Sequence, residues 1–308
     1  KEKYMLSATM RADGSSRFAE KNRWGYFPSI SGGWIITKED FMASTSKILN
    51  FAKLRGSWGQ NGNEEIDSFQ YQSNINYSFP GYFFGDTKPV SGTTAMLANV
   101  PNPDIKWETS EQLDFGIDAR LFDSKLGVTF DWYKKTTKDW LVRAPALGTQ
   151  GAPPSFINGG DVENSGVEYS VNWNDKVGGF KYGITLSGAH NKNEVTRIEN
   201  TDGIIHGPSN VLSQGTGEVS RVQVGQPIGY FYGYQTAGII QNQNEADAWL
   251  TPSGKPYFSD QRPGDVRFVD QNQDGLIDEK DMVYLGNPNP DFELGIQLNL
   301  EYKNVYLN

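Results

Sequence analysis

The sequence predicts an all-β fold of antiparallel strands, and three observations support this prediction. Apolar and polar residues alternate with period two in several stretches of roughly nine residues. Short turns alternate with long connections between these stretches, and aromatic residues gather near their ends. Together these features favour part of a transmembrane β-barrel over a soluble β-sandwich, although alternation itself is typical of both.

The first strands are expected at residues 4–10, 26–36 and 52–58. Tyr4, Leu6 and Met10 share one side of the first stretch, and residues 13–16 read Asp-Gly-Ser-Ser, which is a turn signal. A short helix or an irregular connection is expected at residues 38–49. A long polar and aromatic segment follows at residues 60–106, and connections of this length are usually functional.

The clearest pattern lies at residues 112–133. Leu113, Phe115 and Ile117 alternate with acidic residues and glycine, and the pattern restarts after residues 122–125 with Val128 and Phe130. A strand places successive side chains on opposite faces, whereas a helix would scatter these apolar residues around its circumference. The stretch is therefore predicted to be a hairpin with one apolar face and one polar face.

Three further strands are expected after this hairpin. Alternation recurs at residues 167–173, 180–186 and 292–300, and the chain then enters another strand after a turn at residues 302–304. Residues 134–166 and 191–227 read as long connections. Several strands are thus long enough to cross a bilayer, and long and short connections alternate between them.

Composition excludes several classes of function. The chain has 308 residues, a formal charge of −9 and no cysteine. Without a cluster of lysine and arginine, nucleic acid is not an expected partner. Without cysteine there are no disulfides, thiolate nucleophiles or cysteine-based metal sites. Apolar runs span only a few residues, so any membrane insertion must use strands rather than helices.

Residues 270–281 are the sharpest candidate for a metal site. The oxygen ligands of a calcium loop of the EF-hand type fall at fixed positions of a twelve-residue segment, with glycine at the sixth. This segment supplies Asp270, Asn272, Asp274, Leu276 (through its carbonyl), Asp278 and Asp281. The last position holds aspartate rather than the usual glutamate, and a solvated turn rich in aspartate is the alternative. A structural Ca²⁺ is the predicted cofactor.

Aromatic residues in the connections are the candidates for substrate binding. Exposed aromatic rings can stack on flat or sugar-like ligands, although the same residues can simply pack loops together. The candidates are Tyr71, Tyr82, Phe83, Phe84 and Tyr232. We expect no catalytic residues, because His190 and His206 lack metal-ligand spacing and no serine lies in a nucleophile-elbow pattern. An extracellular glycosidase is a further alternative, and it would need two carboxylates that converge in one cleft.

A series of phrases along nearly the whole chain resembles the SusC/RagA family of TonB-dependent outer-membrane transporters. Each phrase is weak alone, but their order and spacing are specific. The phrases lie at residues 11–18 (RADGSSRF), 25–29 (GYFPS), 54–63 (LRGSWGQNGN), 102–108 (NPDIKWE), 225–229 (GQPIG) and 285–290 (LGNPNP), with an acidic loop after Gly264-Asp265.

The resemblance implies a barrel of 22 strands in the bacterial outer membrane, with long extracellular loops, short periplasmic turns and a plug inside. Residues 1–308 are expected to form part of that single barrel domain, with the plug, the TonB box, the early strands and the C-terminal strands absent. The implied function is import of oligosaccharides, which are favoured over oligopeptides. Import would require a SusD-like lipoprotein and also TonB, which would act through the missing N-terminal part. The alternative is a secreted, calcium-stabilised β-sandwich that binds carbohydrate.

Overall fold

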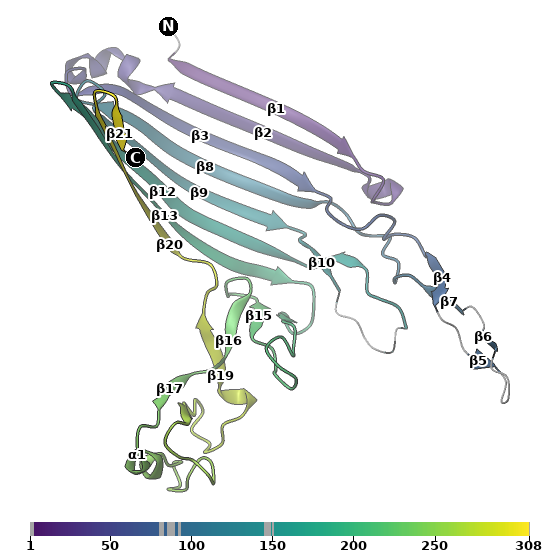
Figure 1. Ribbon diagram of the computed structural model, residues 1–308. Helices are drawn as coiled ribbons and strands as arrows, with labels where there is room; N and C mark the ends of the chain where they lie inside the picture. Colours follow the sequence, from purple (N-terminus) through teal and green to yellow (C-terminus); the bar gives the residue numbers. More distant parts are fainter. Residues whose placement is uncertain are drawn as a thin grey trace. The chain divides into compact units, whose positions relative to one another are not determined.

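The computed structural model describes residues 3–79, 83–84, 90–91, 94–144, 149 and 151–307. Contacts divide the chain into two compact units, residues 1–203 with 291–308, and residues 204–290. The first unit contains one large sheet (Figure 1). Among the described residues, no helix is long and apolar enough to cross a membrane. The predicted all-β, antiparallel fold is confirmed.

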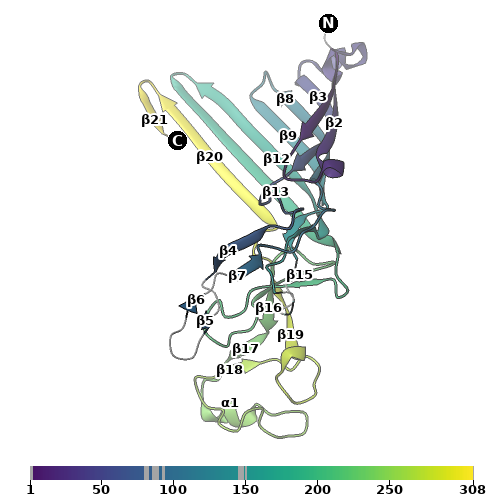
Figure 2. The same ribbon diagram turned by 90° about the vertical axis from the view of Figure 1, so that its right-hand side faces the viewer.

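The large sheet has nine strands, which follow one another in sequence order and pair antiparallel. Figure 2 shows that the sheet is curved rather than flat. Its strands are β1 (Tyr4–Gly14), β2 (Trp24–Ile35), β3 (Leu49–Asn63), β8 (Glu108–Leu121), β9 (Leu126–Lys138), β12 (Gly160–Val177), β13 (Phe180–Ile198), β20 (Phe292–Tyr302) and β21 (Val305–Leu307).

The alternating stretches found in the sequence lie in these strands, except that β2 ends at Ile35, one residue before the stretch predicted at residues 26–36. Strands β12 and β13 are longer than expected. β12 begins at Gly160 rather than near Val167, and β13 continues to Ile198. In the added part Asn164 pairs with Asn193, and polar residues occupy both faces. Since period-two alternation needs one apolar face, the pattern ends before the strand does. The connections predicted at residues 134–166 and 191–227 are therefore shorter.

The connections at one end of the sheet carry small elements of their own. They are η1 (Glu20–Asn22), the pair β4 (Ile75–Phe79) and β7 (Thr94–Leu97), the pair β5 (Phe83–Phe84) and β6 (Val90–Ser91), and the pair β10 (Leu141–Arg143) and β11 (Phe156–Asn158). At the other end, η2 (Ile36–Lys38) and η3 (Asp40–Thr45) join β2 to β3. The segment expected to be helical or irregular, residues 38–49, thus contains 3₁₀ helix up to Thr45 and a turn at residues 46–48.

The second unit, residues 204–290, interrupts the chain between β13 and β20 and consists of short elements. Its buried apolar residues include Tyr230, Ile240 and Ala246. The elements are β14 (Ile204–His206), β15 (Ser220–Gln223), β16 (Tyr230–Tyr234), β17 (Thr236–Ile239), α1 (Gln243–Ala248), β18 (Val266–Phe268), η5 (Glu279–Asp281) and β19 (Met282–Gly286).

Candidate functional site

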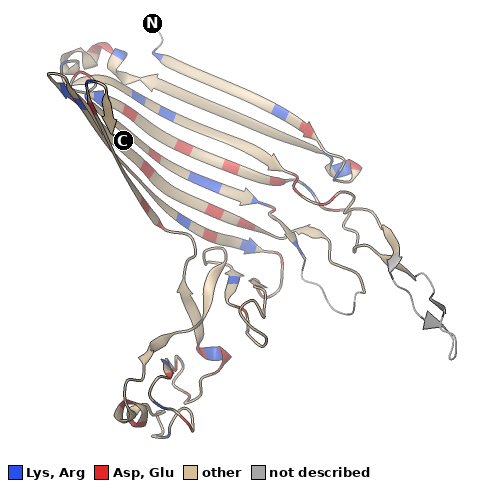
Figure 3. Cartoon of the chain, in the orientation of Figure 1, with Lys and Arg blue, Asp and Glu red and all other residues tan. Residues whose placement is uncertain are grey.

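One face of the large sheet, the polar face, carries a row of aligned residues. Strand register places them side by side across six strands, so their spacing is set by the backbone ladder rather than by loops. Charged residues recur along the strands in Figure 3. The row consists of Arg55, Gly116, Asp131, Glu168, Ala189 and Glu293.

Arg55 holds together the carboxylates of the polar face. Its guanidinium lies 2.6 Å from Asp131, 3.2 Å from Asp118 and 3.6 Å from Asp114. The pair with Asp131 crosses the intervening strand β8, where the aligned residue is Gly116. A Cβ atom at Gly116 would collide with both partners. Glycine therefore lets the ion pair lie flat against the sheet instead of projecting from it.

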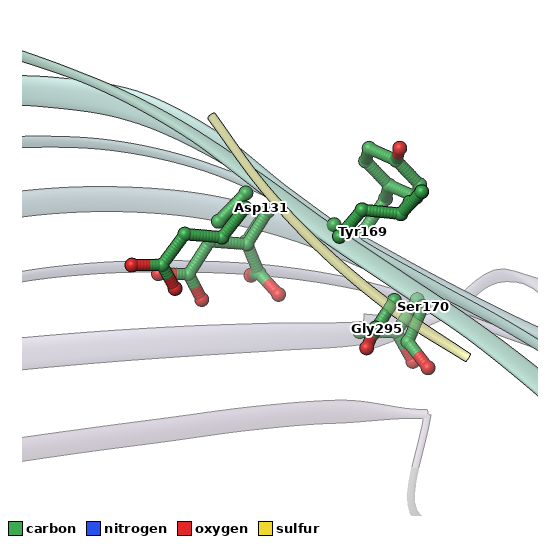
Figure 4. Close-up of a pocket in the computed structure, with 11 residues that line it drawn as sticks. Asp131, Tyr169, Ser170 and Gly295 are labelled. Carbon is green, nitrogen blue, oxygen red and sulfur yellow. The ribbon is translucent and has the colours of Figure 1, made fainter. Parts of the chain in front are cut away.

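A shallow cavity of about 540 Å³ lies beside this network. Three carboxylates and three hydroxyl groups contribute to its lining, on strands β9, β12, β13 and β20. These residues are Asp131, Glu168, Glu293, Thr129, Ser170 and Ser187. Figure 4 shows Asp131, Ser170 and Gly295 on one side of the sheet and Tyr169 on the other. The polar face thus offers hydrogen-bonding groups to a hydrophilic solute.

The opposite face, the apolar face, exposes large hydrophobic residues. Leu6 is 79% exposed, Ile296 70% and Phe115 53%. The same face also carries the aligned row Leu54, Ile117, Phe130, Tyr169, Gly188 and Leu294. A water-soluble protein rarely leaves so continuous an apolar surface uncovered. Alternation of an apolar outer surface with a polar inner one is the pattern of a transmembrane barrel wall.

A small core, the loop cluster, joins three of the long connections at the end of the sheet. It consists of the buried residues Phe18, Ile66, Ile105 and Leu141. Trp107 packs on Phe18 with ring centres 5.3 Å apart, and Arg17 donates to the carbonyls of Glu64 (3.1 Å) and Ile66 (2.7 Å). Sequence reasoning did not assign this core, although Phe18, Ile105 and Trp107 belong to phrases that carried the family resemblance.

The predicted calcium residues form one compact loop, in which most of their side-chain oxygens accept hydrogen bonds from backbone N–H groups of the loop. Asp281 is fully buried and accepts from the N–H groups of Gln271 (2.9 Å) and Asp278 (2.8 Å). Asn272 accepts from Asp274 N–H, and Asp274 from Leu276 N–H. Among the described residues, no group of three acidic or histidine side chains is arranged to hold a metal. Calcium stays a prediction.

Asp270 is the member of this loop whose surroundings are least complete. Its Oδ2 accepts from Gly275 N–H at 2.8 Å and from the Tyr257 hydroxyl at 3.0 Å, whereas its Oδ1 is buried without a hydrogen-bond partner. Desolvation raises the pKa of the Asp270 carboxyl, but hydrogen bonds from Gly275, Tyr257, Gln273 and Asp274 together hold it below its usual value. The side chain is therefore an anion, as a calcium ligand has to be.

The predicted aromatic ligands do not form one platform in the described residues. Tyr71 has the ring of Phe69 as a neighbour, with centres 6.5 Å apart. The guanidinium carbon of Arg221 lies 3.5 Å from the ring centre of Tyr232, so one face of that ring is covered. Tyr82 lies outside the described residues, as do the side chains of Phe83 and Phe84. Substrate binding by these residues stays a prediction.

Comparison with known proteins assigns the family. The model of the family "TonB dependent receptor-like, beta-barrel" matches residues 1–304. TonB-dependent receptor P3 of Formosa agariphila is 33% identical over 99% of the chain and 30% of the relative. TonB-dependent receptor SusC of Bacteroides thetaiotaomicron is 30% identical over 98% of this chain and 28% of the relative. The chain thus spans about 30% of the length of these relatives.

Solved structures agree on the fold. The RagAB peptide transporter superposes with a TM-score of 0.76 at 22% identity, covering 99% of this chain and 30% of that one. The RagAB peptide importer in its 'open-open' state gives a TM-score of 0.72 at 21% identity and similar coverage. The resemblance to SusC and RagA transporters is therefore confirmed. The chain belongs to the β-barrel family of TonB-dependent receptors.

Proposed function

We propose that this chain forms part of the wall of an outer-membrane importer that takes up oligomeric nutrients in a TonB-dependent manner. The observation that carries the proposal is the division of one sheet into an exposed apolar face and a hydrogen-bonding polar face. The apolar face contacts lipid and the polar face borders the passage. Family membership supplies the type of protein in which such a wall occurs.

The polar face suits a hydrophilic cargo. Hydroxyl and carboxylate groups line the cavity beside Asp131, and Arg55 lies flat across Gly116. Such a surface can exchange hydrogen bonds with a passing solute without obstructing it. His190 contacts the carbonyl of Asp291 and His206 contacts Glu218, and neither histidine lines the cavity beside Asp131. We therefore assign transport rather than catalysis to the wall.

We propose oligosaccharides ahead of oligopeptides as the cargo. The aromatic residues of the connections support this order, since aromatic rings can stack on sugars, and so does the similarity to SusC. The comparison structures are of a peptide transporter and show the fold alone at 21–22% identity. A SusD-like lipoprotein and TonB are the proposed partners, and TonB would act through a part of the protein outside this chain.

Uptake by cells tests the proposal directly. A strain lacking the whole transporter gene should lose uptake of its fluorescent oligosaccharide substrate while retaining uptake of oligopeptides, and the intact gene should restore it. Collapse of the proton-motive force should abolish the restored uptake. Loss of peptide uptake alone would reverse the order of cargoes. Unchanged uptake of a full panel of both would contradict import.

A soluble, carbohydrate-binding sandwich is disfavoured by the same sheet. A sandwich packs a second sheet against its apolar face. In the described part of the chain, Leu6, Phe115 and Ile296 of that face remain exposed. The similar solved structures are also transporters rather than sandwiches. The outer membrane is therefore the location we propose.

We also propose a structural role for calcium in residues 270–281. The support is the buried, unpartnered Oδ1 of Asp270, which a cation would satisfy. Calcium added to the intact protein should slow amide hydrogen exchange in this loop and leave β20 unchanged. Asp274→Asn should weaken the effect, because Asp274 is a predicted ligand. Equal exchange with calcium and with a chelator would contradict the proposal.

A further inference from the structure

The connection between β2 and β3 differs from its neighbours. Residues 122–125 join β8 to β9 and residues 178–179 join β12 to β13, whereas residues 36–48 join β2 to β3. The longer connection contains η2 and η3. Figure 1 shows these coiled segments at the same end of the sheet as the two short turns. An additional element therefore lies where a tight turn would suffice.

Glu39 fixes this connection to the apolar side of the sheet. Its Oε1 accepts from the Tyr4 hydroxyl at 2.6 Å and from the Trp34 indole at 3.0 Å, and its Oε2 accepts from Lys3 at 2.9 Å. Tyr4 and Trp34 are register partners whose rings stack with centres 6.3 Å apart. Both continue the apolar face, since Tyr4 shares its side of β1 with Leu6. The connection therefore lies outside the barrel wall.

The connection exposes apolar residues beside cationic ones. Phe41 is 65% exposed and Ile48 57%, and the same segment carries exposed Lys38 and Lys47 together with exposed Asp40. Aromatic rings with lysines are typical of the boundary between a bilayer and water. Lysine attracts lipid phosphate groups, and apolar side chains gain free energy by leaving water. In an exposed loop, Phe41 and Ile48 would have no such benefit.

We infer that residues 36–48 form an interfacial anchor, which lies on the bilayer surface with Phe41 and Ile48 inserted among the phospholipid headgroups. The inference rests on the proposed function, because the neighbouring apolar face has to contact lipid. Its partner is a phospholipid surface, and continuity with the exposed residue Leu6 on β1 supports that assignment. The rings and aliphatic groups would reach roughly 5–10 Å into the boundary region. Glu39 positions the anchor.

Single cysteines can test the anchor in the intact protein, because this chain contains no cysteine of its own. Phe41→Cys and Ile48→Cys would each carry a fluorescent label in phospholipid vesicles. One quencher is a nitroxide attached near the glycerol end of the lipid chains, and the other is iodide in water. Leu6→Cys provides the lipid-facing control, and the exposed Ser209→Cys provides the aqueous control.

The anchor predicts strong quenching by the lipid nitroxide and weak quenching by iodide at positions 41 and 48, as at position 6. Iodide quenching at positions 41 and 48 equal to that at position 209 would overturn the anchor while leaving a lipid-facing position 6 intact. Iodide quenching at position 6 as well would instead overturn the proposed membrane wall. The two failures are therefore distinguishable.

The role of Glu39 is tested by adding Glu39→Ala to Phe41→Cys. Loss of its contacts to Tyr4, Trp34 and Lys3 should release the connection. We expect lipid quenching at position 41 to fall and iodide quenching to rise. Quenching at position 6 should be the same in Leu6→Cys with and without Glu39→Ala. Unchanged quenching at position 41 would overturn the positioning role of Glu39.

Discussion

Large apolar residues occupy opposite environments in two regions of this molecule. On the apolar face of the sheet, Leu6 is 79% exposed and Ile296 70%. In the loop cluster at the strand ends, Phe18 and Ile105 are 0% exposed. The cluster shields its side chains from water with three connections, whereas the apolar face of the sheet leaves these large side chains exposed. In the proposed membrane wall, lipid would take the place that protein takes in the loop cluster.

The largest effect is expected inside the loop cluster. Phe18→Ala should lower the free energy of opening this cluster by about 3–5 kcal/mol, since it removes a fully buried ring and leaves a cavity. Hydrogen exchange of residues 64–70 and 102–107 would measure the change. Phe69→Ala is the matched control, because Phe69 is 48% exposed and its loss should change the free energy by less than about 0.5 kcal/mol. Equal effects would contradict the assigned core.

A cation introduced on the apolar face of the sheet tests whether this face contacts lipid. Ile296→Lys should destabilise the folded, membrane-inserted protein by about 2–4 kcal/mol, because the charge would face the bilayer near its middle. The neighbouring Gln297→Lys points to the polar face and should cost less than about 0.5 kcal/mol. Urea titration of the heat-modifiable folded form in vesicles gives both values. A cost that is equal at both positions would mean that the two faces share one solvent.

Close packing across the polar face gives a smaller expected effect. Gly116→Ala should cost about 1–3 kcal/mol, since the added Cβ displaces Arg55 from Asp131. Gly32→Ala is the control, because a Cβ there has only the Met5 carbonyl within contact, at 3.9 Å. The same urea titration compares the two variants. A neutral Gly116→Ala would show that Arg55 reaches Asp131 without needing the gap.

The smallest effect concerns pH at the β2–β3 connection. The Tyr4 hydroxyl, Lys3 and Trp34 lower the pKa of the Glu39 carboxyl from 4.5 to about 2. Because the folded-state pKa is lowered, the contribution to stability is present above pH 4.5 and is lost as pH falls toward 2. A spin label at position 41 should therefore keep its mobility between pH 7 and pH 4.5 and become mobile near pH 2. Release already at pH 4.5 would contradict the tether.

The sequence predicted the sheet well because its signal is local. Residues 112–133 reveal the β8–β9 hairpin through alternation alone, and the same period marks β1, β2, β3 and β20. Alternation ends where polar residues occupy both faces, so the first residues of β12, from Gly160, were missed. Alternation therefore indicates which face of a strand is apolar, but it does not indicate how far the backbone hydrogen bonding of the strand extends.

The loop cluster and the anchor could not be predicted in the same way. Phe18, Ile105 and Leu141 are far apart in sequence and come together only through the three-dimensional fold. Glu39 likewise binds Tyr4, which is 35 residues away. The calcium motif was visible because its residues are contiguous, but its charge balance depends on Tyr257 and on backbone groups that spacing does not reveal. Local patterns thus locate candidate residues, and the fold decides which of them meet.

If one sheet separates lipid from a polar interior, the two faces of β20 meet different solvents, and a cysteine scan of this strand measures that difference residue by residue. Each position from 292 to 298 would be labelled in the intact protein in vesicles, and quenching by lipid nitroxide and by iodide would be compared. We predict lipid quenching at the even-numbered positions, such as Leu294 and Ile296, and iodide quenching at the odd-numbered ones, such as Gln297. Uniform iodide quenching along the strand would contradict the membrane wall.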